Sequence, residues 1–284
     1  MLRSQPATIA ATFLDSATEA PVDPSPDSAT VQVLRDDGTE LVASTAATNA
    51  GTGRFTFQLT AAHTAQLDLL TARWTATVGG ASTTVETLVE IVGAFLFTLA
   101  EARTLEPLGD TAKYPDADLI AARAIAEDVL EDACNYAFAP RYRRQELDVS
   151  TLTGRLRLDR WHVRRIRWIE ADGEALTSDQ LSALRIYNGR SVDSQSFIFI
   201  PRTTIVVGYE HGLKAPPPAA ARIAKRLAKR YLVKTPIDER ASTMSTEDGT
   251  ISLVTPGVRG MLFDIPEANA FVQQFGRPDP GWGL

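Results

Sequence analysis

The pattern of hydrophobic and polar positions changes in character near residue 93. Before that point, apolar and polar residues alternate in short runs, and a period of two is typical of half-buried strands. The clearest run is Gly53–Leu59, in which Phe55, Phe57 and Leu59 share one face. The alternation predicts strands at Ala7–Leu14, Thr30–Arg35, Leu41–Thr45, Gly53–Leu59, Ala72–Val78 and Thr83–Val92.

Turn residues separate these runs. Asp37-Gly38 and Gly79-Gly80 each lie between two predicted strands, and such dipeptides are strong hairpin signals. Six short strands over residues 1–93 indicate an immunoglobulin-like β-sandwich, with a small open barrel as the alternative. The cysteine pair of antibody domains is absent, so the sandwich is predicted from the pattern alone.

The second half of the chain has helical spacings of three and four. In residues 115–137 these spacings predict a helix with Asp116 as its cap and an apolar face made of Leu119, Ala122, Ala126, Val129, Leu130 and Ala133. Further helices are expected at 219–234 and 265–275. A small β-layer is expected at 144–209, and an extended loop with a short strand at Thr250–Val254 is expected over 241–263.

Residues 94–113 are expected to be a linker with a short helix over Thr98–Arg103. Thr98 is placed to cap this helix, and Glu101 stands at the capping-box position. The fold class predicted is therefore a multidomain chain, all-β plus α+β. It has a sandwich at 1–93 and a mainly helical domain with a small β-layer at 114–284.

Composition excludes several classes of protein. The formal net charge of −6 argues against a domain that wraps nucleic acid, since such domains are usually basic. Cys134 is the only cysteine, so no intramolecular disulfide is possible. No run of about 18 apolar residues indicates a membrane span, and the first residues do not show the pattern of a secretory signal.

A distinctive motif order runs through the second half. Gly208-Tyr-Glu-His-Gly212 follows a β-branched run, Pro216–Pro218 hold the chain extended, and a basic helix follows. Upstream lies Tyr136-Ala-Phe-Ala-Pro140. Downstream lie Ser-Thr-Glu-Asp-Gly-Thr-Ile-Ser-Leu-Val-Thr-Pro-Gly at 245–257 and an element made of Gly260, Phe263, Pro266 and Glu267. In this order the elements resemble the head-to-tail connector (adaptor) proteins of tailed bacteriophages.

That resemblance covers about 170 residues and leaves out the first 93. It implies a virion structural protein that is assembled in the host cytoplasm. The protein would form a dodecameric ring between the portal and the next neck protein, with genomic DNA passing through the lumen without sequence-specific binding. It also implies that the C-terminal segment grips the portal or a neighbouring subunit through Ser245, Glu247, Asp248, Gly249, Leu253, Pro256, Gly257 and Phe263.

Two helices carry opposite charge, and a closed ring requires two unlike surfaces that match. The hypothesis is that these helices meet through their opposite charges, across or within subunits. The subunit-interface candidates are the acids Glu127, Asp128, Glu131 and Asp132 and the cations Arg222, Lys225, Arg226, Lys229 and Arg230. The alternative is that both are simply solvated helix faces, since exposed charges usually contribute little. Contact of the basic helix with phosphates is a further alternative, although no aromatic stacking residues interleave with the cations.

No catalytic constellation is found, and neither a cofactor nor a metal is expected. The three histidines, His63, His162 and His211, stand in different segments without metal-ligand spacing. The remaining alternative is a carbohydrate-binding or adhesive protein that acts through the sandwich. Exposed aromatic residues would support it, but the first 93 residues contain only Phe13, Phe55, Phe57 and Trp74.

Overall fold

The computed structural model describes residues 1–25, 29–148, 155–194, 204–233, 243–246, 249–252, 263 and 265–276. The chain forms two compact units that are interleaved in sequence. Unit 1 contains Met1–Ala94, Pro140–Leu158 and Val163–His211, and unit 2 contains Phe95–Ala139, Asp159–His162 and Gly212–Leu284.

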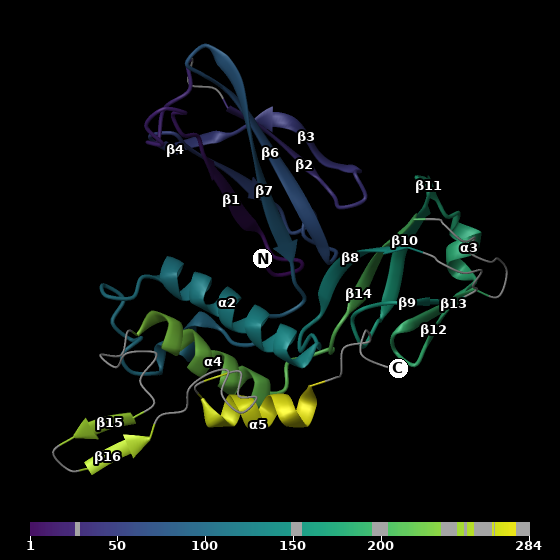
Figure 1. Cartoon of the computed structure of the whole chain (residues 1–284). Helices are drawn as coiled ribbons and strands as arrows, with labels where there is room; N and C mark the ends of the chain where they lie inside the picture. Colours follow the sequence, from purple (N-terminus) through teal and green to yellow (C-terminus); the bar gives the residue numbers. More distant parts are fainter. Residues whose placement is uncertain are drawn as a thin grey trace. The chain divides into compact units, whose positions relative to one another are not determined.

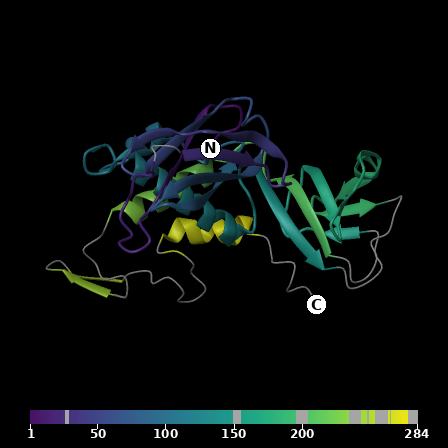
Figure 2. The ribbon, with the colours of Figure 1, turned by 90° about the horizontal axis from the view of Figure 1, so that it is seen from above.

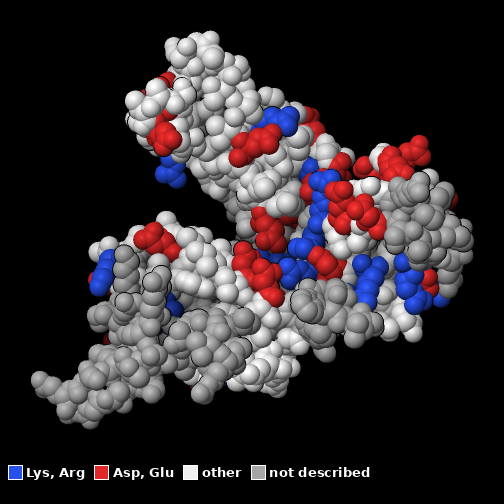
Figure 3. Space-filling model, viewed as in Figure 1, with Lys and Arg blue, Asp and Glu red and all other residues white. Residues whose placement is uncertain are grey.

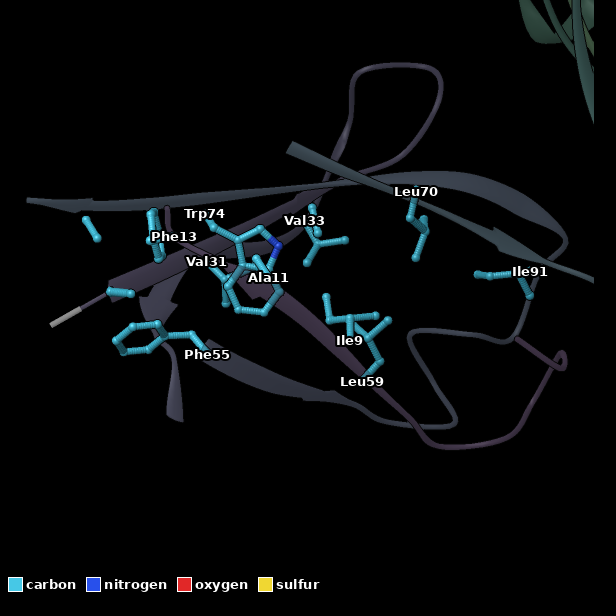
Figure 4. Packing of buried hydrophobic residues seen from close by; sticks show 13 residues of the cluster. Ile9, Ala11, Phe13, Val31, Val33, Phe55, Leu59, Leu70, Trp74 and Ile91 are labelled. Carbon is cyan, nitrogen blue, oxygen red and sulfur yellow. The ribbon is translucent and has the colours of Figure 1, made fainter. Parts of the chain in front are cut away.

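The first part of unit 1 consists of two antiparallel sheets around one core (Figure 1). One sheet has the order β1-β5-β4 and the other β3-β2-β6-β7. The alternation read from the sequence directs Phe55, Val31 and Trp74 into this core, where all three are fully buried (Figure 4). The strands are β1 (Ala7–Thr12), β2 (Ala29–Leu34), β3 (Glu40–Ala46), β4 (Thr48–Gly51), β5 (Arg54–Leu59), β6 (Asp68–Val78) and β7 (Ala81–Ile91).

The second part of unit 1 is a pair of small antiparallel sheets with the orders β11-β10-β14-β8 and β12-β13-β9. A second core, which includes Val192, Ile205, Val207 and Tyr209, holds the two sheets together. Their elements are β8 (Arg141–Asp148), β9 (Arg155–Arg157), β10 (Arg165–Ala171), β11 (Glu174–Ala175), α3 (Ser178–Ser182), β12 (Leu184–Tyr187), β13 (Ser191–Ser194) and β14 (Thr204–His211).

Polar contacts join the two parts of unit 1. The backbone N–H of Gly93 donates to the carbonyl of Pro140, and Arg141 pairs with Glu90 at 3.1 Å. A hydrogen-bond chain then runs from Trp168 Nε1 to the Tyr142 hydroxyl (3.0 Å) and from that hydroxyl to Asp36 Oδ2 (2.8 Å). The pKa of Asp36 is raised above its ordinary value of 3.8, mainly because the carboxyl group is partly buried.

Unit 2 contains α1 (Leu99–Arg103), α2 (Asp116–Cys134), α4 (Pro218–Leu232), α5 (Pro266–Phe275) and the hairpin β15 (Thr243–Thr246) and β16 (Gly249–Ser252). Helices α4 and α5 lie side by side in both ribbon views (Figures 1 and 2). Aromatic rings join α5 to the segment after α2, because Phe271 lies 5.2 Å from Phe138 between ring centroids.

Several local predictions are confirmed. Thr98 caps α1, and the reciprocal bonds with Glu101 complete the capping box. The cap predicted for α2 is wrong, because Pro115 precedes the helix without a side-chain bond and Asp116 pairs with Arg103 instead. The strand β4 was missed, since its residues Thr-Asn-Ala-Gly carry turn formers and no apolar side chain larger than alanine. Residues 195–203 of the expected β-layer lie outside the described residues.

The predicted fold class is wrong for the second half. The chain is mostly β, and the five helices among the described residues are short. Residues 141–211 alone form two sheets with their own core, so this part is more than a small layer on a helical domain. The cause is that two of the strands, β11 and β13, have two and four residues, and alternation over so short a run gives little signal. The immunoglobulin-like assignment of the first half stays a prediction.

Candidate functional site

The acidic residues of α2 divide between a buried and an exposed face. Glu127 is 2% exposed and its Oε1 accepts a hydrogen bond from Leu96 N at 2.7 Å. Glu131 is 7% exposed and accepts from Phe138 N at 2.9 Å. These two carboxylates therefore satisfy backbone donors of the segments on either side of α2, as buried charge requires.

Arg123 completes this buried charged row, one helical turn before Glu127. Its guanidinium lies 3.5 Å from the centroid of the Phe95 ring, and its Nη1 donates to the Phe97 carbonyl. The row thus ties residues 95–97 onto α2 through backbone and aromatic contacts. It stabilises unit 2 from within the subunit.

The opposite face of α2 is exposed and mixes apolar with acidic residues. Ile120 is 46% exposed, Ile125 48% and Val129 37%, and the exposed alanines of the helix lie between them. The prediction that Val129 belongs to the buried face is therefore wrong. Because an α-helix turns by about 100° per residue, Asp128 and Asp132 also lie between Ile120 and Ile125 on this face, and Asp132 pairs with Arg160 at 2.6 Å. We call Ile120, Ile125, Asp128 and Val129 the α2 surface.

The cations of α4 follow the amphipathic pattern of that helix. Ala220, Ile223, Ala224, Leu227 and Ala228 are buried, which leaves Arg222 and Arg226 exposed. Lys225, Lys229 and Arg230 are half-buried. Arg226 pairs with Glu267 of α5 at 2.5 Å. Helices α2 and α4 contact each other within the subunit. The exposed cations lie on the side of α4 opposite its buried residues. We call Arg222 and its neighbours Lys225 and Arg226 the α4 surface.

Most of the residues expected to grip a portal or neighbour lie outside the part of the chain that the structure describes. Glu247, Asp248, Leu253, Pro256 and Gly257 are outside the described residues. Ser245 and Gly249 lie in the two strands of the β15–β16 hairpin. Phe263 is 6% exposed, and its backbone N–H and carbonyl bond to the side-chain amide of Asn269 at 2.9 and 2.6 Å. This residue anchors the start of α5 and is not free to reach a partner.

The other candidates remain separate. His63 bonds locally to Thr60, His162 lies against Tyr136, and His211 lies against Tyr209. Within the described residues, no group of three or more metal-ligating side chains occurs. Burial raises the pKa of the Cys134 thiol to about 12, so this buried residue is a poor nucleophile. Of the four aromatic residues before residue 94, three are fully buried and Phe57 is partly buried.

The sequence indicated charged surfaces and missed the apolar one. Ile120 and Ile125 lie outside the buried stripe formed by Leu119, Ala126 and Leu130. The sequence therefore shows a helix with apolar residues on two sides, and this is the signal that could have revealed the exposed isoleucines. Among the described helices, none is long and apolar enough to cross a membrane. Figure 3 shows the distribution of charge over one face of the molecule, with the surface of the first seven strands largely uncharged in this view.

Comparison with known proteins gave one structural similarity to report. No family model matches the sequence, and no curated protein matches it. Among solved structures, the chain is similar to a chain described as "Neck of empty GTA particle computed with C6 symmetry". The identity is 17% and the TM-score is 0.45, over 66% of this chain and 93% of that chain. At this TM-score the similarity supports no conclusion about fold or role.

Proposed function

We propose that this chain is a structural protein of a tailed-bacteriophage virion, the adaptor that forms a ring between the portal and the tail. The order of motifs from Tyr136 to Glu267 supports the assignment to the adaptor proteins of tailed bacteriophages. The observation that carries self-assembly is the presence of two unlike exposed surfaces on one compact unit. The α2 surface is apolar and acidic, and the α4 surface is cationic.

Unlike surfaces suit a head-to-tail contact. In such a contact, one face of a subunit meets a different face of the next copy, and a ring results when the rotation closes. The isoleucines and Val129 supply apolar area, at roughly 25 cal/mol for each Å² removed from water. Asp128 opposite Arg222 adds register and selectivity. The portal, the next neck protein and the passing genome are the partners expected of such a ring.

The first experiment measures mass by light scattering, for the protein alone and with a purified portal assembly. Self-assembly into a closed ring, or stoichiometric capture onto the portal, supports the proposal. A monomer that ignores the portal contradicts it. Because adaptor rings can require the portal as a template, both measurements are needed before the proposal is rejected.

A mixing experiment tests the head-to-tail contact itself. Ile125→Asp disables the α2 surface and Arg222→Glu disables the α4 surface, so neither variant assembles alone. When they are mixed, the intact α4 surface of the first meets the intact α2 surface of the second, and a one-to-one pair forms that cannot grow. Leu14→Asp is the matched control, because Leu14 in the sandwich is 49% exposed and Ile125 is 48% exposed. Continued ring formation by Ile125→Asp contradicts the assignment of the α2 surface.

A further inference from the structure

Strand β7 is the outermost strand of its sheet and is long. It pairs with β6 along all of Ala81–Ile91 in one uninterrupted register. Among the described residues, backbone bonds to its other edge occur at one end of the strand. Met1 N donates to Glu90 O at 2.6 Å, Val92 N donates to Met1 O, and Arg3 N donates to Val92 O.

These three bonds show which backbone groups face the open edge. In a strand, the N–H and C=O of one residue point to the same side, and the direction alternates from residue to residue. Glu90 and Val92 face outward, so the groups of Ser82, Thr84, Glu86 and Leu88 face outward as well. In the part of the chain that the structure describes, no strand pairs with this stretch.

The edge lacks most of the features that usually prevent pairing. Proteins protect exposed edge strands with charged side chains, above all lysine, with proline, with a bulge or with a short length. The sequence Ala-Ser-Thr-Thr-Val-Glu-Thr-Leu-Val-Glu-Ile of β7 contains no lysine, arginine, proline or glycine. Its charged residues are Glu86 and Glu90, and it is rich in β-branched residues. Leu88, on the exposed face of the strand, is 68% exposed.

We infer that the β7 edge pairs antiparallel with the β7 edge of a second copy of this chain. The open stretch Ser82–Leu88 is centred on Val85, so the register that uses all four outward residues places Val85 opposite Val85 of the second copy. Thr83 then lies opposite Thr87, and Thr84 lies opposite Glu86. Pairs of β-branched residues at such positions stabilise a sheet. The product is one continuous sheet through two sandwiches.

Charge favours this register over the one centred on Glu86. Glu86 already pairs with Arg73 of its own chain at 2.8 Å, and in the Val85-centred register it faces a threonine. A register centred on Glu86 places two glutamates directly opposite each other, which is destabilising. It also requires Glu90, whose outward carbonyl is already bonded to Met1. This pairing is two-fold and involves unit 1 alone, so it does not rest on the adaptor ring.

Disulfide cross-linking of the full-length protein tests the register. Cys134, the one native cysteine, is fully buried, whereas Thr83, Val85 and Thr87 are half-buried, so a cysteine placed at one of them supplies the only thiol that is not fully buried. In the Ile125→Asp background, which disables the α2 surface, Val85→Cys is expected to form a covalent dimer under mild oxidation. Thr87→Cys alone is not, because its neighbour is Thr83 of the second copy. A mixture of Thr83→Cys and Thr87→Cys chains is expected to cross-link as a heterodimer.

Leu14→Cys is the control for collisional cross-linking, since Leu14 is more exposed than the half-buried Val85 and lies outside β7. Equal yields for Val85→Cys and Leu14→Cys overturn the inference, and so does cross-linking of the Val85→Cys chain to a different protein. A second measurement avoids any cysteine: sedimentation of the unmodified chain and of Glu86→Pro. Proline is tolerated at an edge position whose N–H faces outward, and the loss of that donor in both copies is expected to weaken dimerisation about tenfold or more. A chain that stays monomeric at high concentration overturns the inference.

Discussion

At the scale of single residues, Gly208 makes possible the hydrogen-bond chain that joins the parts of unit 1. A Cβ on residue 208 would lie 2.3 Å from Trp168 Nε1 and 2.5 Å from the Tyr142 hydroxyl. Both atoms belong to the bonds that lead to Asp36. Only glycine lets strand β14 approach these two side chains closely enough for the chain of bonds to form.

Gly208→Ala is therefore expected to lower the free energy of unfolding by about 1–3 kcal/mol, as overpacking of a fitted site does. Denaturant unfolding measures the change. The control is Gly109→Ala, where the added Cβ would meet one carbonyl at 3.4 Å and the change is expected to be small. Equal effects of the two substitutions contradict this account.

Asp36 gives the same joint a pH dependence. Its pKa in the folded protein is raised, so the folded state binds the proton more tightly than the unfolded chain does. The stability that this group contributes is present at low pH and is lost as pH rises from 3.8 through the raised folded value. Asp36→Asn keeps an oxygen that accepts from Tyr142 and removes the charge.

At pH 7, Asp36→Asn is thus expected to raise the melting temperature relative to the unmodified protein. The difference should shrink as the pH is lowered and disappear below about 3.8, where Asp36 is protonated in both states. Thermal melts across the range from acidic to neutral pH test this. If the difference in melting temperature does not vary with pH, ionisation of the Asp36 carboxyl group is not its cause.

At the scale of elements, α2 contacts the rest of the unit on one side and presents exposed apolar and acidic residues on the other. Its buried carboxylates are fixed by neighbouring segments: Glu127 by Leu96 and Glu131 by Phe138. The acidic face expected from the sequence is therefore two different sets of residues. One set holds unit 2 together, and the other, Asp128 and Asp132, lies on the exposed face of α2.

Glu127→Ala is expected to lower the free energy of unfolding by about 1–3 kcal/mol, because it leaves the buried Leu96 N–H without its acceptor. Asp128→Ala, one residue further along the same helix, is expected to change it by no more than about 0.5 kcal/mol. Chemical unfolding of the two variants measures the contrast. Comparable losses would show that burial does not distinguish these two acids.

At the scale of the whole molecule, the chain leaves and re-enters each unit. Residues 95–139 separate the two parts of unit 1, and strand β14 leads directly from unit 1 into the turn at Gly212 that precedes α4. The motif Gly208–Gly212 therefore marks a crossing between units. Gly212 has a φ of +94°, and a Cβ there would lie 2.1 Å from the Ala139 carbonyl, so this crossing requires glycine.

If the head-to-tail contact forms as proposed, salt should weaken it without abolishing it. The Debye length falls from about 10 Å at 0.1 M salt to about 3 Å at 1 M, which screens Asp128 from Arg222 but leaves the apolar contact intact. The double variant Asp128→Asn, Arg222→Gln should lose most of this salt dependence. Light scattering at a series of salt concentrations measures the assembly of the unmodified protein and of the double variant. If salt weakens the two assemblies equally, the Asp128–Arg222 pair does not contribute to the contact.

The sequence by itself determined the local structure. Alternation of apolar and polar residues located the strands β1, β2, β3, β5, β6 and β7. Helical periodicity located α2, α4 and α5, and a capping box located α1. Each of these signals depends only on neighbouring residues and on the period of the backbone. It also placed the exposed cations of α4. Tertiary structure alone decided which acids of α2 are buried, since that depends on residues 96 and 138 that lie outside the helix. It likewise decided that residues 141–211 form two sheets and that β7 ends its sheet with an open edge. Pairing between strands distant in sequence is settled by the packing of the whole chain, and no local pattern carries that information.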